Sequence, residues 1–379
     1  MYTEQYQWTS KKGWQPALTT QLGEKAQLVF CFGSTGIIKE KQQFDIIKHM
    51  YPKAHLIGCT TSGEIAGTSV CDDSLVITAV QFEKTSLRFG KVKINNASET
   101  YQGAEALAKQ FDHQDLKHLF VLSEGLSVNG SELVKGIADH LPTHVAVTGG
   151  LSGDGARFSE TYMVTNGEVE RNTVAAVGFY GQHLKVGYGS LGGWDPFGPE
   201  RIVTRSKGNI LYELDGKSAL ELYKKYLGEH AAGLPATGLL FPLSLLSGDQ
   251  QSGVVRTILA VDEKEQSLTF AGDIPQGAKV RLMKANFDRL IDGAVGAAQN
   301  SHVPLAASSS QLAILISCVG RKLILKQRVE EEVEGVREVL GQQAVLTGFY
   351  SYGEISPFTP NAKCELHNQT MTITILSEK

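Results

Sequence analysis

The sequence predicts a mixed α/β protein in which large mixed β-sheets, flanked by helices, are divided between two pseudo-equivalent halves. Apolar runs with the character of buried strands alternate with amphipathic stretches along the 379 residues. Such alternation is typical of α/β and α+β folds. Residues 56–65 (L-I-G-C-T-T-S-G-E-I) and 345–355 (V-L-T-G-F-Y-S-Y-G-E-I) share four positions, namely Gly58 with Gly348, Gly63 with Gly353, Glu64 with Glu354 and Ile65 with Ile355.

Each copy of this pattern follows an apolar run and ends in a glycine turn that carries a carboxylate. Glycine tolerates positive φ and close backbone approach, which other residues adopt only at a cost. The pattern therefore predicts two related halves, each presenting a glutamate to a shared site. A less complete third copy is expected at 148–154, with Thr148 in place of the first glycine and Asp154 in place of the glutamate.

The elements expected in the first half are mostly strands bounded by glycine or proline. Residues 26–32 (A-Q-L-V-F-C-F) are apolar enough for a strand buried on both faces. Further strands are expected at 55–58, 73–82, 86–93, 117–122, 145–148, 160–164, 174–180, 184–190, 201–205 and 211–214. Helices are expected at 44–50, 104–111, 132–140 and 215–228, the last capped by Asp215 and ended by Gly228.

The second half repeats this alternation. Strands are expected at 238–243, 253–262, 267–271, 279–283, 311–317 and 370–376, and helices at 286–298 and 328–340. The last helix is acidic and amphipathic, because Val329, Val333, Val336 and Leu340 recur at helical spacing. Residues 229–236, rich in alanine, glycine and proline, predict the boundary between a domain at 26–228 and a domain at 229–379. Residues 1–25 are expected to form a polar N-terminal tail.

Composition and charge place the chain among ordinary globular proteins. A formal charge of −4 and a pI near 6.2 give no electrostatic reason to expect nucleic acid as a partner. The five cysteines are odd in number and never form C-x-x-C, which favours a reducing cytoplasm over a disulfide scaffold. Neither a signal peptide nor a membrane-spanning run is recognisable, so we expect a cytoplasmic protein without membrane insertion.

One glycine motif resembles a nucleotide site but lacks its context. Residues 187–192 satisfy G-x-G-x-x-G, yet a turn and a strand follow where dinucleotide binding needs a helix. Residues 149–155 lack the lysine of a P-loop. Neither motif predicts phosphate binding.

Catalytic and metal-binding patterns leave alternatives open. Glu64, Asp154 and Glu354 can supply acid–base carboxylates to a hydrolase or transferase, or can simply cap turns. Cys364 and His367 stand at C-x-x-H spacing before the last strand. His367 can ligate a metal with Asn368 orienting it, or can be bound to a turn backbone.

Several motifs together resemble the FIST sensory family. They are I-G-C-T-T-S-G-E-I, G-G-L-S-G-D-G, G-W-D-P-F-G-P-E-R-I-V-T-R-S-K-G-N-I-L-Y-E-L-D-G-K-S-A-L, C-V-G-R-K, L-T-G-F-Y-S-Y-G-E-I and E-L-H-N-Q-T. The match runs from about residue 26 to 376, with a part similar to FIST N before a part similar to FIST C. The resemblance implies a bacterial signal-input protein rather than an enzyme, carrying the sensory part alone and regulating a histidine kinase or a cyclic-di-GMP enzyme in trans.

The chain is also similar to stand-alone family members that bind haem and sense nitric oxide. This implies haem as cofactor, with His367 as the axial ligand and His144 and His183 as weaker candidates. The alternative is a haem-independent sensor of amino acids or another small metabolite. In both cases the resemblance implies a pocket at the glycine turns, whose walls and anchors are Gly149, Gly150, Trp194, Phe349, Tyr350, Tyr352, Asn368, Glu64, Asp154 and Glu354.

Overall fold

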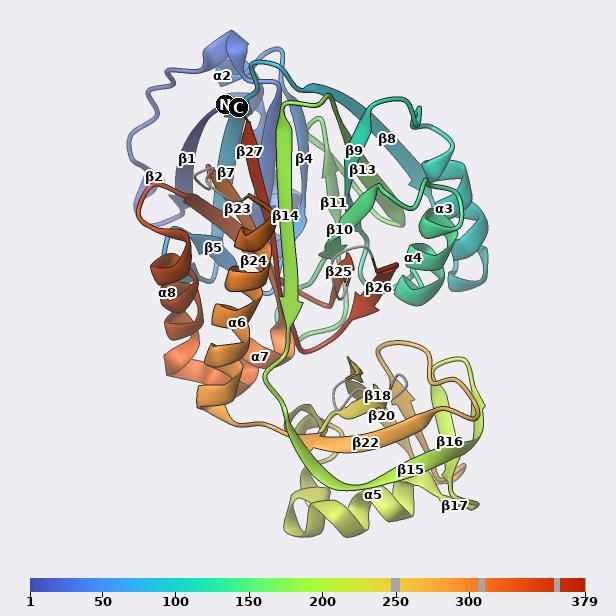
Figure 1. The fold of residues 1–379 in the computed structure, drawn as a ribbon. Coiled ribbons are helices and arrows are strands. Elements are labelled where there is room, and N and C mark those ends of the chain that lie inside the picture. The colour runs from blue at the N-terminus through green and yellow to red at the C-terminus, as the bar shows by residue number, and fades with distance from the viewer. Residues whose placement is uncertain (247–252, 306–310, 358–361, 379) are drawn as a thin grey trace.

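The computed structural model describes residues 1–246, 253–305, 311–357 and 362–378. They form a larger body built on three mixed sheets and a small domain built on a fourth sheet (Figure 1). The small domain comprises residues 195–284 and is inserted between β14 and α6 of the body. The mixed α/β class, with large sheets flanked by helices, is confirmed.

The body contains three repeats of one strand arrangement rather than two halves. The first repeat holds β1 (Tyr2–Thr9), β2 (Gly13–Gln15), β3 (Leu28–Gly33), α1 (Thr35–Glu40), α2 (Gln42–Met50), β4 (His55–Thr60), β5 (Glu64–Ala66), β6 (Ser69–Cys71) and β7 (Ser74–Gln81). The second holds β8 (Ser86–Lys93), α3 (Thr100–Ala108), β9 (Leu116–Ser123), α4 (Gly130–Ala138), β10 (Ala146–Leu151), β11 (Met163–Thr165), β12 (Glu168–Glu170) and β13 (Thr173–Tyr180). The third holds β14 (Leu184–Leu191), α6 (Phe287–His302), β23 (Leu312–Cys318), α7 (Val319–Leu325), α8 (Val329–Leu340), β24 (Val345–Ser351), β25 (Gly353–Pro357), β26 (Cys364–His367) and β27 (Met371–Glu378).

Each repeat forms a sheet with the same strand arrangement, and one short strand of each repeat pairs with the sheet of a neighbouring repeat. A parallel pair (β3 with β4, β9 with β10, β23 with β24) is joined by a helical crossover and flanked by an antiparallel third strand (β7, β13, β27). The strand after the pair then crosses over: β5 pairs with β24, β11 with β4 and β25 with β10. This cyclic exchange ties the three repeats into one unit.

Three equivalent glycines explain the repeated sequence pattern. A Cβ added to Gly58, Gly149 or Gly348 would lie 1.8 Å from a carbonyl oxygen of the parallel partner strand. Only glycine allows that approach. The expected correspondence of Gly58 with Gly348 therefore holds between the first and third repeats. In the second repeat the equivalent residue is Gly149, so the expected placement on Thr148 was one residue off.

The turns that follow these glycines interlock around the pseudo-threefold axis. Each donates a backbone hydrogen bond to the next repeat, namely Ser62 N to Tyr350 O (2.8 Å), Gly153 N to Thr60 O (2.9 Å) and Tyr352 N to Leu151 O (3.2 Å). The second repeat departs from the others after this turn, because β11 starts only at Met163. Asp154 therefore lies in an extra loop, and Met163 rather than Asp154 takes the register position of Glu64 and Glu354.

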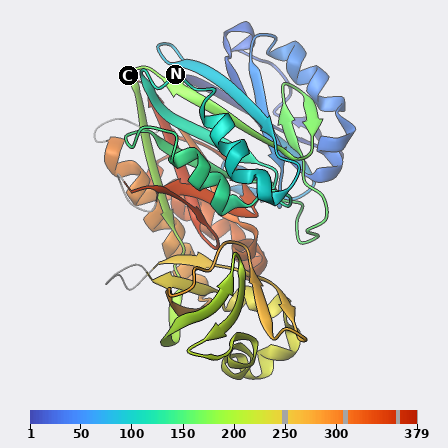
Figure 2. The ribbon, with the colours of Figure 1, turned by 90° about the vertical axis from the view of Figure 1, so that its right-hand side faces the viewer.

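The body buries its apolar residues on both sides of the sheets. The inner faces of all three sheets share one core, which includes Phe30, Phe32, Phe120 and Phe349. The rings of Phe32 and Phe349 lie 4.7 Å apart between centroids. The helices cover the outer faces, with α3 and α4 on one sheet and α6 and α8 on another (Figures 1 and 2). Strands buried on both faces account for the continuous apolar runs of the sequence.

The small domain is a β-rich unit with one helix. It contains β15 (Asp195–Lys207), β16 (Ile210–Leu214), β17 (Lys217–Ser218), α5 (Ala219–Leu227), β18 (Leu243–Leu246), β19 (Val254–Arg256), β20 (Ile258–Asp262), β21 (Ser267–Phe270) and β22 (Lys279–Lys284). Helix α5 packs its apolar face against the sheet. The boundary expected at 228/229 lies inside this domain.

Four local expectations differ from the structure. Asp215 does not cap α5. It has a positive φ of 51° and its Oδ1 accepts a hydrogen bond from Ile202 N, while Ser218 caps the helix. Residues 1–25 are more than a tail, because β1 pairs with β7 along eight residues. The strands expected at 160–164 and 238–243 begin later, as β11 and β18, since turns and a 3₁₀ segment precede them.

The G-x-G-x-x-G motif lies in a strand. Gly187 and Gly189 belong to β14, where an added Cβ would lie 1.9 Å from Ser301 O and 2.3 Å from Ala297 O of α6. The glycines let α6 pack closely on β14. They serve helix–sheet packing and present no helix N-terminus to a phosphate.

Candidate ligand-binding cleft

A cleft between the body and the small domain is lined by residues of both. It holds a cavity of about 270 Å³. The body contributes residues of the loop 125–130 at the start of α4, and the small domain contributes residues 270–273 of the segment after β21. The other lining residues are Ala97, Leu151, Phe158, Tyr352, Asn209 and Leu259. This volume lies just below the roughly 300–1,000 Å³ of ordinary ligand pockets, so the cavity, formed between two domains, suits a small organic molecule.

Exposed apolar side chains gather in this cleft. Leu126 is 39%, Phe158 44% and Leu259 43% exposed, and all three line the cavity. The ring of Phe158 stacks on that of Tyr352 with 4.4 Å between centroids. Clustered exposed apolar groups mark binding surfaces, whereas singly scattered ones do not.

A buried carboxylate holds Phe158 in place. Asp154 accepts backbone hydrogen bonds from Phe158 (2.8 Å), Ser159 (3.0 Å) and Glu160 (2.9 Å), and another from the Tyr352 hydroxyl. Burial by itself would raise the pKa of Asp154, but these hydrogen bonds outweigh it and hold the pKa below its ordinary value. Asp154 therefore stays ionised and fixes the extra loop of the second repeat against the third repeat.

The loop before α4 uses its own side chains to bind its backbone amides. The Glu124 carboxylate accepts hydrogen bonds from Leu126 N (3.1 Å) and Ser127 N (2.7 Å). Asn129 Oδ1 accepts from Ser131 N (3.0 Å) and from Glu132 N (3.2 Å), which caps the helix. Glycine-rich loops at helix N-termini often bind anions, but these amides already have partners.

On the opposite wall of the cleft, which the small domain forms, Asn209 and Phe270 are also hydrogen-bonded within the protein, whereas the carboxylate of Asp273 is not. Asn209 Nδ2 donates to Phe270 O at 2.8 Å, and Phe270 N donates to Asn209 O at 2.9 Å. Asp273 is half-buried and lines the cavity, and within the described residues its carboxylate forms no hydrogen bond and no ion pair. Arg256 lies behind it, with Nε 3.3 Å from the backbone oxygen of Asp273 and Nη1 2.8 Å from Leu366 O.

Asp273 also lines a second cavity, of about 510 Å³. Its lining is mixed in charge, with Lys135, Arg256 and Lys363 facing Asp139, Asp273 and Glu365. Burial lowers the pKa of Arg256 to about 10, so the guanidinium remains charged at neutral pH.

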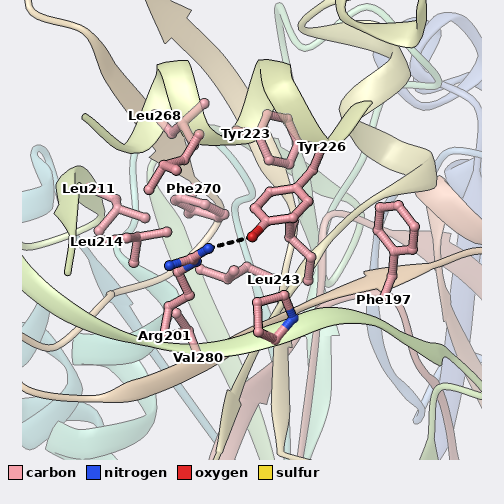
Figure 3. A pocket seen from close by; sticks show the side chains of 13 residues that line it. Phe197, Arg201, Leu211, Leu214, Tyr223, Tyr226, Leu243, Leu268, Phe270 and Val280 are labelled. Atoms are coloured by element: carbon pink, nitrogen blue, oxygen red, sulfur yellow. Dashed lines mark hydrogen bonds between the residues drawn. The ribbon is translucent and has the colours of Figure 1, made fainter. Parts of the chain in front are cut away.

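A third cavity, inside the small domain, is too small for a ligand. It lies between α5 and the sheet, and Figure 3 shows Tyr226 hydrogen-bonded to Arg201 at its edge. Its volume of about 20 Å³ is close to that of one water molecule. It is a packing defect of the domain core.

Glu64 and Glu354 occupy equivalent positions but share no site. Glu64 accepts hydrogen bonds from the amide and the hydroxyl of Ser74, and Glu354 accepts the same pair from Thr370. Burial raises the pKa of Glu64 to about 7 and that of Glu354 to about 8. Neither lines any of the five cavities described for this chain. Each carboxyl group caps a turn within its own repeat.

Most of the other expected pocket residues lie in the core. Phe349 and Tyr350 are fully buried, and the Tyr350 hydroxyl donates to Glu332 at 2.6 Å. Gly149 and Gly150 are buried by close packing, since a Cβ on Gly150 would lie 2.7 Å from Ile316. These residues support the fold and do not line the cleft.

Trp194 stands at the entry to the small domain. Its indole Nε1 donates to Gln369 O at 2.8 Å. The ring therefore anchors the segment that connects β14 with β15 to a turn of the third repeat. Of the expected residues, only Tyr352 lines the cleft directly, and Asp154 acts there through Tyr352 and Phe158.

His367 and Asn368 lie inside the body. His367 is fully buried and its Nε2 is 2.9 Å from Ser356 O, and burial lowers the pKa of the imidazole to about 4. Asn368 is also buried, and neither of its amide atoms has a hydrogen-bond partner in the described residues. The imidazole is hydrogen-bonded to the backbone of the neighbouring strand β25, whereas the alternative to metal ligation had been a bond to a turn backbone.

The three histidines considered as haem ligands do not fit that role in this arrangement. His367 lines none of the five cavities described for this chain. His144 lines a cavity of about 100 Å³, far below the roughly 300–1,000 Å³ of ordinary ligand pockets, and His183 is exposed. Among the described residues, no group of three or more His, Cys, Asp or Glu side chains is arranged to hold a metal ion.

Sequence reasoning missed the side chains that form the cleft. Leu126 and Leu259 lie in segments without apolar periodicity, and Asp273 follows a glycine in a loop. One local signal was present, because S-E-G-L-S-V-N-G at 123–130 follows a buried strand and precedes a helix. A loop at the end of a parallel strand is a common site of binding residues in α/β folds.

Two adjacent family models match the chain. The FIST N domain matches residues 27–217, about half of the chain, and the FIST C domain matches residues 219–357. The chain belongs to the FIST family. The FIST domains indicate a sensory role with a small ligand. The junction between the two matches falls inside the small domain of this FIST protein.

Relatives and solved structures are more distant. An uncharacterized protein of Methanocaldococcus jannaschii is 24% identical over 340 residues, covering 83% of this chain and 64% of its own length. The chain thus spans less than two thirds of that relative. A cyanuric acid hydrolase from A. caulinodans matches with a TM-score of 0.39 and 9% identity, over 100% of this chain and 99% of its own. A chorismatase matches with a TM-score of 0.35 and 9% identity, over 99% and 98%.

Within the described ranges, no helix of this FIST protein is both long and apolar enough to span a membrane.

Proposed function

We propose that this FIST protein is a sensory protein that binds a small metabolite, without haem, in the cleft between its body and its small domain. The observation that carries the proposal is the gathering of Leu126, Phe158 and Leu259 around one interdomain cavity. A ligand there covers apolar surface from both parts of the molecule at once. Ligand sites are commonly found at such domain interfaces.

Binding in this cleft is coupled to the placement of the small domain. Only two chain segments join the domain to the body, one after β14 and one before α6. A ligand that contacts both walls favours the closed placement over any placement in which the walls separate. The change in placement is the signal in this proposal.

The two connecting segments meet at a buried ion pair. Arg321 is fully buried, pairs with Glu332 of α8 at 2.7 Å, and donates to Gly192 O (2.5 Å) and Leu290 O (2.7 Å). These carbonyls flank the two segments. The guanidinium therefore links α8, which has an exposed acidic face, to the places where the two connecting segments leave the body. The partner is a histidine kinase or a cyclic-di-GMP enzyme acting in trans, as the resemblance implies.

Haem and nitric oxide are not part of this proposal. His367, the residue expected to ligate haem, is buried with its Nε2 at a backbone carbonyl. A haem-independent sensor requires only a site for a small molecule, and the cleft between the body and the small domain offers one.

A metabolite screen by thermal shift tests the proposal. A ligand at 100 times its Kd adds about 2.7 kcal/mol to stability, which is readily measured. Phe158→Ala is expected to remove most of the shift caused by any metabolite found, because the ring forms part of the cavity wall. Ile46→Ala, which removes an exposed apolar side chain elsewhere, is the matched control. A metabolite that stabilises all three proteins equally would place the site outside the cleft and refute the proposal.

A further inference from the structure

We infer that the ligand of the cleft is a small organic cation, an amine with an apolar or aromatic group, whose ammonium binds Asp273. This inference rests on the proposed function and adds the chemical class of its ligand. Among the described residues that line the cavity of about 270 Å³, Asp273 is the one with an acidic or basic side chain. Its carboxylate has no hydrogen-bond or ion-pair partner within the described residues.

The walls offer little to an anion. Within the part of the chain that the structure describes, no lysine, arginine or histidine lines this cavity. Five amides at the start of α4 and in the loop before it are bound to nearby side chains: Leu126 and Ser127 to Glu124, Ser131 and Glu132 to Asn129, and Gly125 to Thr161. Within the described residues, only the amides of Val128 and Gly130 in this loop lack such a partner. On the opposite wall, Phe270 N and Ala271 N donate to backbone carbonyls. A carboxylate or phosphate would lose its hydration without gaining equivalent donors.

The nearby charges do not neutralise Asp273 within the cavity. Arg256 lines the neighbouring cavity and forms no ion pair with Asp273 within 4 Å. Burial lowers the pKa of Arg256, and attraction to Glu365 and, more weakly, to Asp273 opposes that effect. Asp154, behind Tyr352, has Arg157 at 3.8 Å. An incoming ammonium therefore meets one carboxylate whose oxygens accept no hydrogen bond from the described part of the protein.

The remaining lining suits the rest of such a ligand. Phe158 is stacked on Tyr352, and Leu126 and Leu259 lie along the same cavity. Apolar side chains remove the hydrocarbon part of an amine from water. An aromatic face within about 6 Å of an ammonium also attracts it. One carboxylate together with apolar and aromatic walls is the chemistry that recognises an amine.

Three probes that share a phenyl ring separate the charge classes. They are 2-phenylethylamine, L-phenylalanine and 3-phenylpropanoate, and isopentylamine is added as an aliphatic amine. Calorimetric titration of the full chain is expected to detect binding of at least one amine and none of 3-phenylpropanoate. Asp273→Asn is expected to weaken amine binding about tenfold or more. Asp292→Asn, at an exposed acid of α6, is expected to leave it unchanged.

The outcomes distinguish this inference from the proposed function. If a neutral or anionic metabolite binds, loses affinity in Phe158→Ala and keeps it in Asp273→Asn, the cation inference is wrong while the cleft remains the site. Failure of both amines to bind the wild-type protein also overturns the inference. Amine binding that Asp273→Asn and Phe158→Ala both leave intact would overturn the inference and count against the cleft itself. Retention of binding in Asp273→Glu, which keeps the charge, would support it.

Discussion

Glu354 provides a quantitative test of how the repeats are built. An ordinary glutamate has a pKa of 4.5, and burial raises that of Glu354 to about 8, although hydrogen bonds from Ser351 and Thr370 oppose the rise. Each pKa unit corresponds to about 1.4 kcal/mol, so ionising this group in the folded protein costs about 5 kcal/mol more than in the unfolded chain. Between pH 4.5 and 8 the folded state binds more protons than the unfolded state, and its stability therefore falls as the pH rises.

Glu354→Gln imitates the neutral carboxyl and removes this titration. The free energy of unfolding of the variant, relative to wild type, is expected to rise by about 5 kcal/mol at most between pH 4.5 and pH 8.5. Urea denaturation at several pH values measures this difference, and Glu64, His367 and all other groups titrate alike in both proteins. Glu334→Gln, on the exposed side of α8, is the control and should leave the pH profile unchanged. Parallel profiles for wild type and Glu354→Gln would refute the assignment of Glu354 as a buried neutral acid.

Three further changes test the packing of the body. Gly348→Ala places a methyl group against the carbonyl oxygen of Leu315 in the neighbouring strand, so the free energy of unfolding measured in urea should fall by about 3 kcal/mol. Gly36→Ala is the control, because its methyl group meets open space and should not destabilise the protein. Arg321→Met leaves Glu332 buried without its partner, and the expected loss is about 3–5 kcal/mol. Replacing both residues by apolar ones should recover much of that loss, and additive losses would contradict the pairing. Trp194→Phe removes the hydrogen bond that anchors the first connecting segment, so hydrogen exchange at 192–195 should accelerate while the body stays protected.

The sequence alone determined the parts of the structure that depend on local chemistry. The apolar run at 26–32, the helix from Val329 to Leu340 and the glycine turns were predictable, because burial on both faces, helical spacing and close backbone approach each leave a local pattern. The family was also recognisable, because its motifs are contiguous. Glu64 and Glu354 were expected at the glycine turns and lie at the start of the strands that follow those turns. Whether their carboxyl groups point into a pocket or cap the turn depends on what packs above them.

Only the tertiary structure decided the number of repeats and the position of the cleft. The extra loop between β10 and β11 separates Gly149 from the strand that follows it, so the sequence showed the full pattern only twice. In the structure three strands, β5, β11 and β25, pair with their partner strands in the same register. The burial of His367 follows from pairing β26 with β25, which no spacing reveals. Leu126, Phe158, Leu259 and Asp273 come together because an inserted domain is placed against the second repeat. Contacts between residues so far apart in the chain are set by strand pairing and domain packing. The hydrophobic periodicity of each separate segment does not reveal them.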